Sequence, residues 1–116
     1  MLDRSPRALL LIARSAGGTA AGFAVVEPLA GRDKPVVQVS YIGVRPRLWG
    51  RGVGERLLRE VRRRFTATGY ARTELSVYDN NHRALALYER LGWRPRGLPT
   101  AHPRTGKPEQ RYELRL

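Results

Sequence analysis

Three mostly apolar runs separated by short polar segments open the chain, at residues 8–14, 21–27 and 36–44. Gly17 and Gly18 lie between the first two runs and are typical of a hairpin turn. Pro28 is expected to end the second run, and a turn at 31–33 leads to the third. The third run is β-branched and almost continuous, which predicts burial on both faces. The pattern therefore predicts three strands in an antiparallel meander.

After the third run, the spacing of apolar residues changes to that of an amphipathic helix. A first helix is predicted by an apolar stripe with helical spacing, Leu57, Leu58, Val61 and Phe65. Gly69 is placed to end this helix, because glycine readily takes the left-handed conformation at a helix C-terminus. The basic cluster on the same helix is interpreted as a solvated face, and it consists of Arg59, Arg62, Arg63 and Arg64.

A second helix and three more strands complete the pattern. Residues 72–78 predict the fourth strand, and the polar residues 79–81 are candidate N-caps for the second helix. The apolar stripe of this helix consists of Ala84, Leu87, Tyr88 and Leu91, before Gly92. Residues 93–98 and 110–116 are predicted as the last strands, with a proline-containing loop between them.

The predicted order is β-β-β-α-β-α-β-β, in a single domain that covers residues 1–116. Helices after the third and fourth strands indicate a mixed sheet with helices packed on it, an α/β fold of the mixed α+β kind. The length of 116 residues and the apolar content of 41% suit one compact domain with its own core.

Composition narrows the classes of function. No apolar run approaches the roughly 20 residues that span a bilayer, so no membrane partner is expected. The chain has no cysteine, which excludes disulfides and a thiolate nucleophile and fits a cytoplasmic location. His82 and His102 are the two histidines, so we expect no metal site. The net charge of +12 suits nucleic acid or an anionic cofactor, but no nucleic-acid-binding motif accompanies it.

A glycine-rich segment between the third strand and the first helix carries the clearest local chemistry. It consists of Trp49, Gly50, Arg51, Gly52, Val53 and Gly54. Glycines allow a close approach of the backbone to a ligand, and the helix that follows presents free N–H groups, which suits a pyrophosphate. Glu55 and Arg56 then exclude a Walker A loop, and Glu55 also stands where a dinucleotide-binding fingerprint needs glycine. A connector without a ligand is the alternative.

Two motifs in order resemble those of the GNAT-type N-acetyltransferase superfamily. Val44-x-Pro46 followed by Gly50-x-Gly52-x-Gly54 is similar to the pyrophosphate-binding motif of that family. The second similarity is Asn81-x-x-Ala84-x-x-Leu87-Tyr88 with Gly92-Trp93. The resemblance runs from about residue 21 to the C-terminus. It implies the acyl-CoA N-acyltransferase fold, here lacking the usual first strand and two N-terminal helices.

The resemblance also implies a site for acetyl-CoA in a splay between the third and fourth strands. Backbone groups of Ile42 and Val44 would hold the pantetheine arm, and the segment 49–54 would hold the pyrophosphate, with Arg51 adding a charge. Asn81 would contact the cofactor, and Tyr88 would protonate the leaving thiolate. Taken alone, Asn81 is equally well a helix cap, and a Tyr on an apolar stripe, such as Tyr88, is more often a core residue than a catalytic one.

Three departures from the family pattern stand out. Trp49 replaces the usual Arg or Gln, no counterpart of the N-terminal helices is found, and no clear general base is present; Glu27 is a weak candidate. The leading hypothesis is acetyl transfer from acetyl-CoA to a primary amine of an unidentified acceptor, a small molecule or a protein. A homodimer that completes the acceptor site is one way to supply the missing wall. The alternatives are an inactive acyl-CoA-binding module and, more remotely, a small basic nucleic-acid-binding protein.

Overall fold

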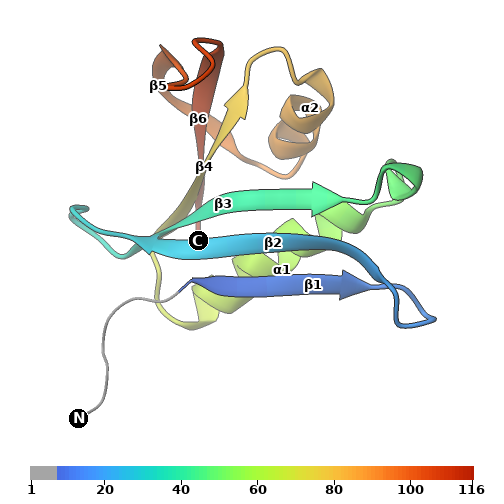
Figure 1. Cartoon of the computed structure of the whole chain (residues 1–116). Helices are drawn as coiled ribbons and strands as arrows, with labels where there is room; N and C mark the ends of the chain where they lie inside the picture. The colour runs from blue at the N-terminus through green and yellow to red at the C-terminus, as the bar shows by residue number, and fades with distance from the viewer. Residues whose placement is uncertain (1–7) are drawn as a thin grey trace.

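The computed structural model describes residues 8–116, and its helices and strands follow the predicted order (Figure 1). The first half of the chain forms β1 (Leu9–Arg14), β2 (Ala20–Leu29), β3 (Val36–Val44), the short 3-10 helix η1 (Pro46–Leu48) and α1 (Val53–Ala67). The second half forms β4 (Arg72–Tyr78), α2 (His82–Arg90), β5 (Arg94–Ala101) and β6 (Pro108–Arg115). The mixed α+β architecture is confirmed, and η1 is an addition to it.

The strands form one sheet in the order β1-β2-β3-β4-β6-β5. The first three strands are an antiparallel meander, as predicted, and β3 and β4 are the parallel neighbours. These two strands pair only from Val36–Arg72 to Gln38–Glu74. Beyond that point they diverge, so the sheet has two halves, β1–β3 and β4–β6, joined over a short stretch (Figure 1).

A β-bulge at Ser40 coincides with this divergence. Val25 on β2 pairs with Tyr41, whereas Val26 pairs with Val39, so Ser40 is an extra residue on β3. A bulge bends its strand and increases the local twist. Because pairing with β4 ends at Gln38, two residues before the bulge, we infer that the bulge helps β3 to turn away from β4.

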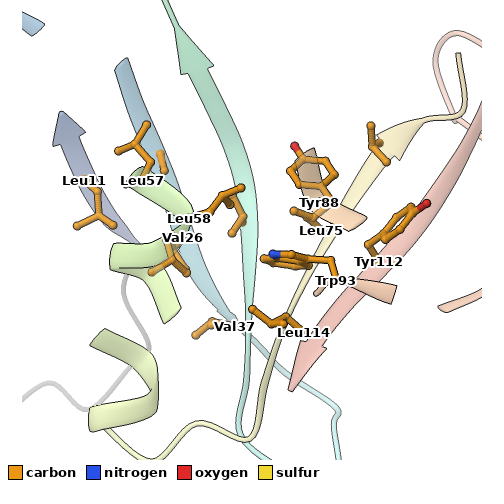
Figure 2. Packing of buried hydrophobic residues seen from close by; sticks show 14 of the residues in the cluster. Leu11, Val26, Val37, Leu57, Leu58, Leu75, Tyr88, Trp93, Tyr112 and Leu114 are labelled. Atoms are coloured by element: carbon orange, nitrogen blue, oxygen red, sulfur yellow. The ribbon is translucent and has the colours of Figure 1, made fainter. Parts of the chain in front are cut away.

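One cluster of buried apolar side chains joins both helices to the sheet (Figure 2). Leu57, Leu58 and Val61 of α1 are buried in it, as the helical stripe predicts. Tyr88 of α2 packs beside Trp93 and Tyr112, with ring centroids 6.0 and 6.3 Å away. The other predicted core positions are half-buried at the margin of the cluster, and these are Phe65, Ala84, Leu87 and Leu91.

Several predicted boundaries were wrong. Pro28 does not end the second strand, because it pairs with Val37 and β2 continues to Leu29. Strand β5 continues to Ala101, and β6 begins at Pro108, so the loop between them is shorter than expected. Proline removes an N–H donor but still permits an extended backbone, and β5 is an edge strand where a missing donor is tolerated.

The third strand is not buried along its whole length. Val36, Val37 and Val39 are buried, whereas Ser40 and Tyr41 are exposed and the last three residues are half-buried. The change occurs where β3 leaves β4. A continuous apolar pattern therefore marks a strand buried on both faces only over the part that has a neighbour on each side.

Candidate functional site

The free edge of β3, which we define as residues 39–44 beyond its pairing with β4, has no strand partner on the β4 side. The Arg45 N–H donates to the carbonyl of Ala21 on β2 at 2.9 Å, so Arg45 and Ala21 form a hydrogen-bonded pair. In an antiparallel ladder such pairs alternate with non-hydrogen-bonded pairs, whose backbone N–H and C=O groups point away from the neighbouring strand. The N–H and C=O groups of Ile42 and Val44 therefore point away from β2, to the side from which β4 has diverged.

The glycine loop, residues 49–54, lies between η1 and α1. Gly50 and Gly52 have φ angles of +77° and +82°, which favour glycine. Gly52 is the N-cap of α1 and supplies no side-chain hydrogen bond to it, so the first N–H groups of the helix have no side-chain cap. A Cβ atom on Gly52 would meet nothing within 4 Å. The loop thus combines open space, free N–H groups and the positive end of a helix dipole, which fits an anionic ligand.

Not every N–H group of this loop faces a ligand. The Arg51 N–H donates to the Leu48 carbonyl at 3.3 Å, so this N–H group of the predicted pyrophosphate-binding segment 49–54 is engaged within the protein. Arg51 retains an exposed side chain that can contact phosphate. The Val53 side chain is buried in the core, so only its backbone can take part in binding.

Trp49 connects the glycine loop to the free edge of β3. Its indole Nε1 donates a hydrogen bond to the Val44 carbonyl at 2.9 Å, while 55% of the residue is exposed. Arg83, the second residue of α2, lies over the indole with its guanidinium carbon 5.4 Å from the ring centroid. The sequence interpretation missed Arg83. The sequence does contain a signal for Arg83: it is a cation in the first turn of a predicted helix, where the helix dipole disfavours positive charge, so another role for it can be sought.

Helix α2 also supplies the two predicted residues of the second motif. The Asn81 side chain accepts a hydrogen bond from the Ala84 N–H at 3.3 Å, which confirms its role as a helix cap. The Tyr88 ring is buried, and burial raises the pKa of its hydroxyl. Among residues 8–116, Thr73 has the one fully buried side-chain polar atom without a hydrogen-bond partner. The Tyr88 hydroxyl has no such partner there either, so its oxygen keeps some solvent access although the residue is only 6% exposed; the oxygen points away from Trp93 (Figure 2).

The carboxylates of Glu27 and Glu74 are poor candidates for a general base. Glu27 accepts hydrogen bonds from the Ser40 hydroxyl and from Gln38, and these bonds, that of Ser40 first, lower its pKa. Glu74 is buried, and burial alone would raise its pKa. Hydrogen bonds from arginines outweigh that effect and bring the pKa of Glu74 to about 2; the donors are Arg111, Arg72 and Arg32 at 2.6, 2.9 and 3.3 Å.

Two other kinds of site find no support in the part of the chain that the structure describes. Within residues 8–116, no group of three or more metal-ligating side chains is clustered. No helix in the same range is both long and apolar enough to cross a bilayer. Among the described residues, the glycine loop and the free edge of β3 combine backbone donors with open space.

Comparison with known proteins identifies this arrangement. The sequence model of the acetyltransferase (GNAT) family matches residues 2–93. The chain belongs to this family. The resemblance carried by the glycine segment and by the Asn81 motif is thus confirmed at the level of the family, and the sheet and helices match solved structures of GNAT proteins.

Three relatives of the GNAT chain illustrate the similarity. The chain is 43% identical over 98 residues to the N-alpha-acetyltransferase RimI of Mycobacterium tuberculosis; the match covers 81% of this chain and 57% of the relative. The structure of the ribosomal-protein-S18-alanine N-acetyltransferase of Escherichia coli superposes with a TM-score of 0.79 at 26% identity, over 94% of this chain and 69% of that protein. A nourseothricin acetyltransferase gives a TM-score of 0.81 at 26% identity, over 93% and 65%.

Proposed function

We propose that this GNAT chain transfers an acetyl group from acetyl-CoA to a primary amine. The observation that carries the proposal is the meeting of the glycine loop with the free edge of β3, which supports an anion site next to outward-facing backbone groups. The family supports the reaction class. The chain spans about 57% of the length of the curated relative that it matches, so the activity of the whole relative is carried over here only as part of this proposal.

Each part of the site has a distinct role in this proposal. Acetyl-CoA would supply an acetyl group activated as a thioester. The N–H groups at the start of α1 would bind its pyrophosphate, and Ile42 and Val44 would align its pantetheine arm through backbone hydrogen bonds. Tyr88 would donate its hydroxyl proton to the departing sulfur, since a raised pKa keeps the phenol protonated at neutral pH. Asn81 caps the first turn of α2, the helix that carries Tyr88, and it would also contact the cofactor.

The acceptor is a primary amine, and the relatives suggest which amines to test first. The Mycobacterium relative is named an N-alpha-acetyltransferase, which favours the α-amino group of a peptide. The nourseothricin acetyltransferase shows that a similar fold is also associated with a different kind of acceptor. A homodimer that completes the acceptor site and a cytoplasmic location stay predictions.

A second candidate function is acyl-CoA binding without catalysis. It is favoured by the state of Glu27, whose carboxylate is engaged by Ser40 and Gln38 and has a lowered pKa. Such a carboxylate is a weak base for an ammonium acceptor. An acceptor amine with a low pKa would need no base, so the two candidates differ in whether any amine is acetylated.

The test begins with thermal unfolding of the purified chain with and without acetyl-CoA, with NAD as the control nucleotide. Acetyl-CoA at a hundred times its Kd should stabilise the fold by about 2.7 kcal/mol, which raises Tm by several degrees. Free thiol released in the presence of a peptide α-amine and of small amines then measures transfer. A shift with thiol release supports the transferase, whereas a shift without release from any amine supports the binding module. No shift with acetyl-CoA contradicts both.

A further inference from the structure

Arg83 and Trp49 form a pair at the border between α2 and the glycine loop. The Arg83 guanidinium lies over the Trp49 ring at 5.4 Å, and both side chains are exposed. A guanidinium over an indole face is attracted to it by a cation–π interaction. The pair therefore favours a positive charge at a defined place although the two residues are far apart in the sequence.

The same guanidinium reaches the backbone of the glycine loop. A Cβ atom on Gly50 would lie 3.2 Å from Arg83 Nη2, so the Arg83 side chain occupies the space beside this glycine. Gly50 also requires its left-handed backbone, with φ of +77°. The charge is thus placed directly against the loop whose helix, α1, presents free N–H groups.

Arg83 has no acidic partner within the described range, residues 8–116. Several other arginines of the helices do have one: Arg59 and Arg90 pair with Glu55, and Arg63 and Arg64 pair with Glu60. A cation near the N-terminus of α2 also opposes the helix dipole. The position of Arg83 is therefore not explained by an ion pair or by helix stability, which leaves its charge available for an anion.

Trp49 is itself held in place by the free edge of β3. Its Nε1 donates to the Val44 carbonyl at 2.9 Å, which restrains the indole on which Arg83 rests. The planar, forked guanidinium suits two phosphate oxygens at once. A tryptophan in place of the Arg or Gln usual at position 49 thus exchanges a direct polar side chain for a platform that holds an arginine from another helix.

We propose that Arg83 is a phosphate-binding residue of this protein and that Trp49 positions it, so that it contacts the diphosphate of a coenzyme A donor at the glycine loop. This inference rests on the proposed function, because it assigns further residues to the same site. Arg83 is a binding residue in this proposal, and Trp49 acts through it.

Calorimetric titration of the full chain with CoA tests the assignment without any turnover. Arg83→Ala should weaken CoA binding about tenfold, and Arg83→Lys should recover part of the loss, because it keeps the charge but not the fork. Arg62→Ala is the matched control: it removes an exposed arginine of α1 that has no ion pair among the described residues and lies outside the loop. It should leave CoA affinity within twofold of the wild type.

Two further comparisons test the phosphate and the platform. The loss in Arg83→Ala should be equal for CoA and 3′-dephospho-CoA, because both contain the diphosphate. Trp49→Leu should weaken binding to a similar degree, and the double variant should lose less than the sum of the two single losses, because the residues act as a unit. Since both side chains are exposed, the Tm of each ligand-free variant should stay close to that of the wild type.

The outcomes separate this inference from the proposed function. Wild-type binding of CoA with unchanged affinity in Arg83→Ala overturns the role of Arg83 and leaves the proposed function standing. A loss that disappears with 3′-dephospho-CoA assigns Arg83 to the 3′-phosphate and overturns the diphosphate contact. Failure of the wild type to bind CoA contradicts the proposed function, and the role of Arg83 falls with it.

Discussion

Tyr88 combines a buried ring with a hydroxyl that keeps some solvent access. The ring packs between residues of the core, beside Trp93 and Tyr112, so the position of the hydroxyl is fixed by packing and not by a hydrogen bond. Burial raises its pKa, so the group is a proton donor throughout the neutral range. These properties suit a general acid that acts on a sulfur leaving group.

Replacing Tyr88 by phenylalanine should therefore separate catalysis from binding. We expect Tyr88→Phe to lower kcat by 10²-fold or more, in the range typical of lost general acid catalysis, with acetyl-CoA affinity unchanged. Steady-state kinetics with the best amine found and calorimetric titration of acetyl-CoA measure the two effects. Because the raised pKa lies above the ordinary value near 10, the wild type should show no loss of activity from this group below about pH 10. Undiminished turnover in the variant would remove Tyr88 from the proposed role.

At the scale of elements, the close approach of β2 to its neighbours depends on one glycine. A Cβ atom on Gly22 would lie 2.7 Å from the Gly43 carbonyl oxygen and 3.0 Å from Val53 Cγ1. The first of these contacts is with backbone, which cannot move aside as a flexible side chain does. Gly22 thus lets β2, β3 and the first residue of α1 pack together next to the glycine loop.

Gly22→Ala should destabilise the fold by about 1–3 kcal/mol, the usual cost of overpacking a well-packed interior. Its matched control is Gly17→Ala, because a Cβ atom on Gly17 meets nothing within 4 Å and its φ is not positive. Urea unfolding of both variants measures the difference. Equal midpoints for the two variants would show that β2 can shift without cost.

The elements themselves were largely predictable because their signals are local. The spacing of Leu57, Leu58 and Val61 predicts which side of α1 is buried, and Asn81 precedes α2 as a cap. Strand ends were less predictable, since whether a proline such as Pro28 ends a strand depends on the neighbouring strand.

The site was predictable only in part for the same reason. The glycine segment is read from adjacent residues, whereas the Trp49–Arg83 pair joins residues 34 positions apart and depends on how α2 packs against the loop. The bulge at Ser40 and the short pairing of β3 with β4 depend equally on tertiary structure. The assignment of cofactor roles to these residues stays a proposal.

At the scale of the whole molecule, buried Glu74 links several parts of the sheet through hydrogen bonds. It accepts from Arg72 on its own strand, from Arg111 on β6 and from Arg32 in the β2–β3 connection. A buried carboxylate surrounded by arginines stabilises the fold only while it is ionised. Within residues 8–116, Glu74 is the one buried acidic side chain, and it lies where the two half-sheets of this strongly basic chain meet.

This arrangement predicts acid sensitivity. Because the folded-state pKa of Glu74, about 2, lies below the ordinary value of 4.5, its contribution is complete above about pH 5 and is lost as pH falls toward 2. The contribution is about 3 kcal/mol at neutral pH by linkage. The urea midpoint of the wild type should decrease as the pH is lowered from about 5 to 2, whereas that of Glu74→Gln should start lower and change less.

Glu60→Gln is the control, because Glu60 also has a pKa of about 2 but is paired at the surface, where salt screens its effect. Parallel pH profiles for the wild type and Glu74→Gln would contradict this role.

The parting of β3 from β4 also has a kinetic consequence for individual amide protons. The N–H groups of Ile42 and Val44 face an edge without a strand partner, whereas those farther back on β3 lie where both neighbours are present. The amides of Ile42 and Val44 should therefore exchange with deuterium early in an experiment on the ligand-free protein. An acyl-CoA that binds along this edge would slow the exchange of these two amides specifically. Two amide signals would then report occupancy of the site, whichever amine the protein acetylates and even if it acetylates none.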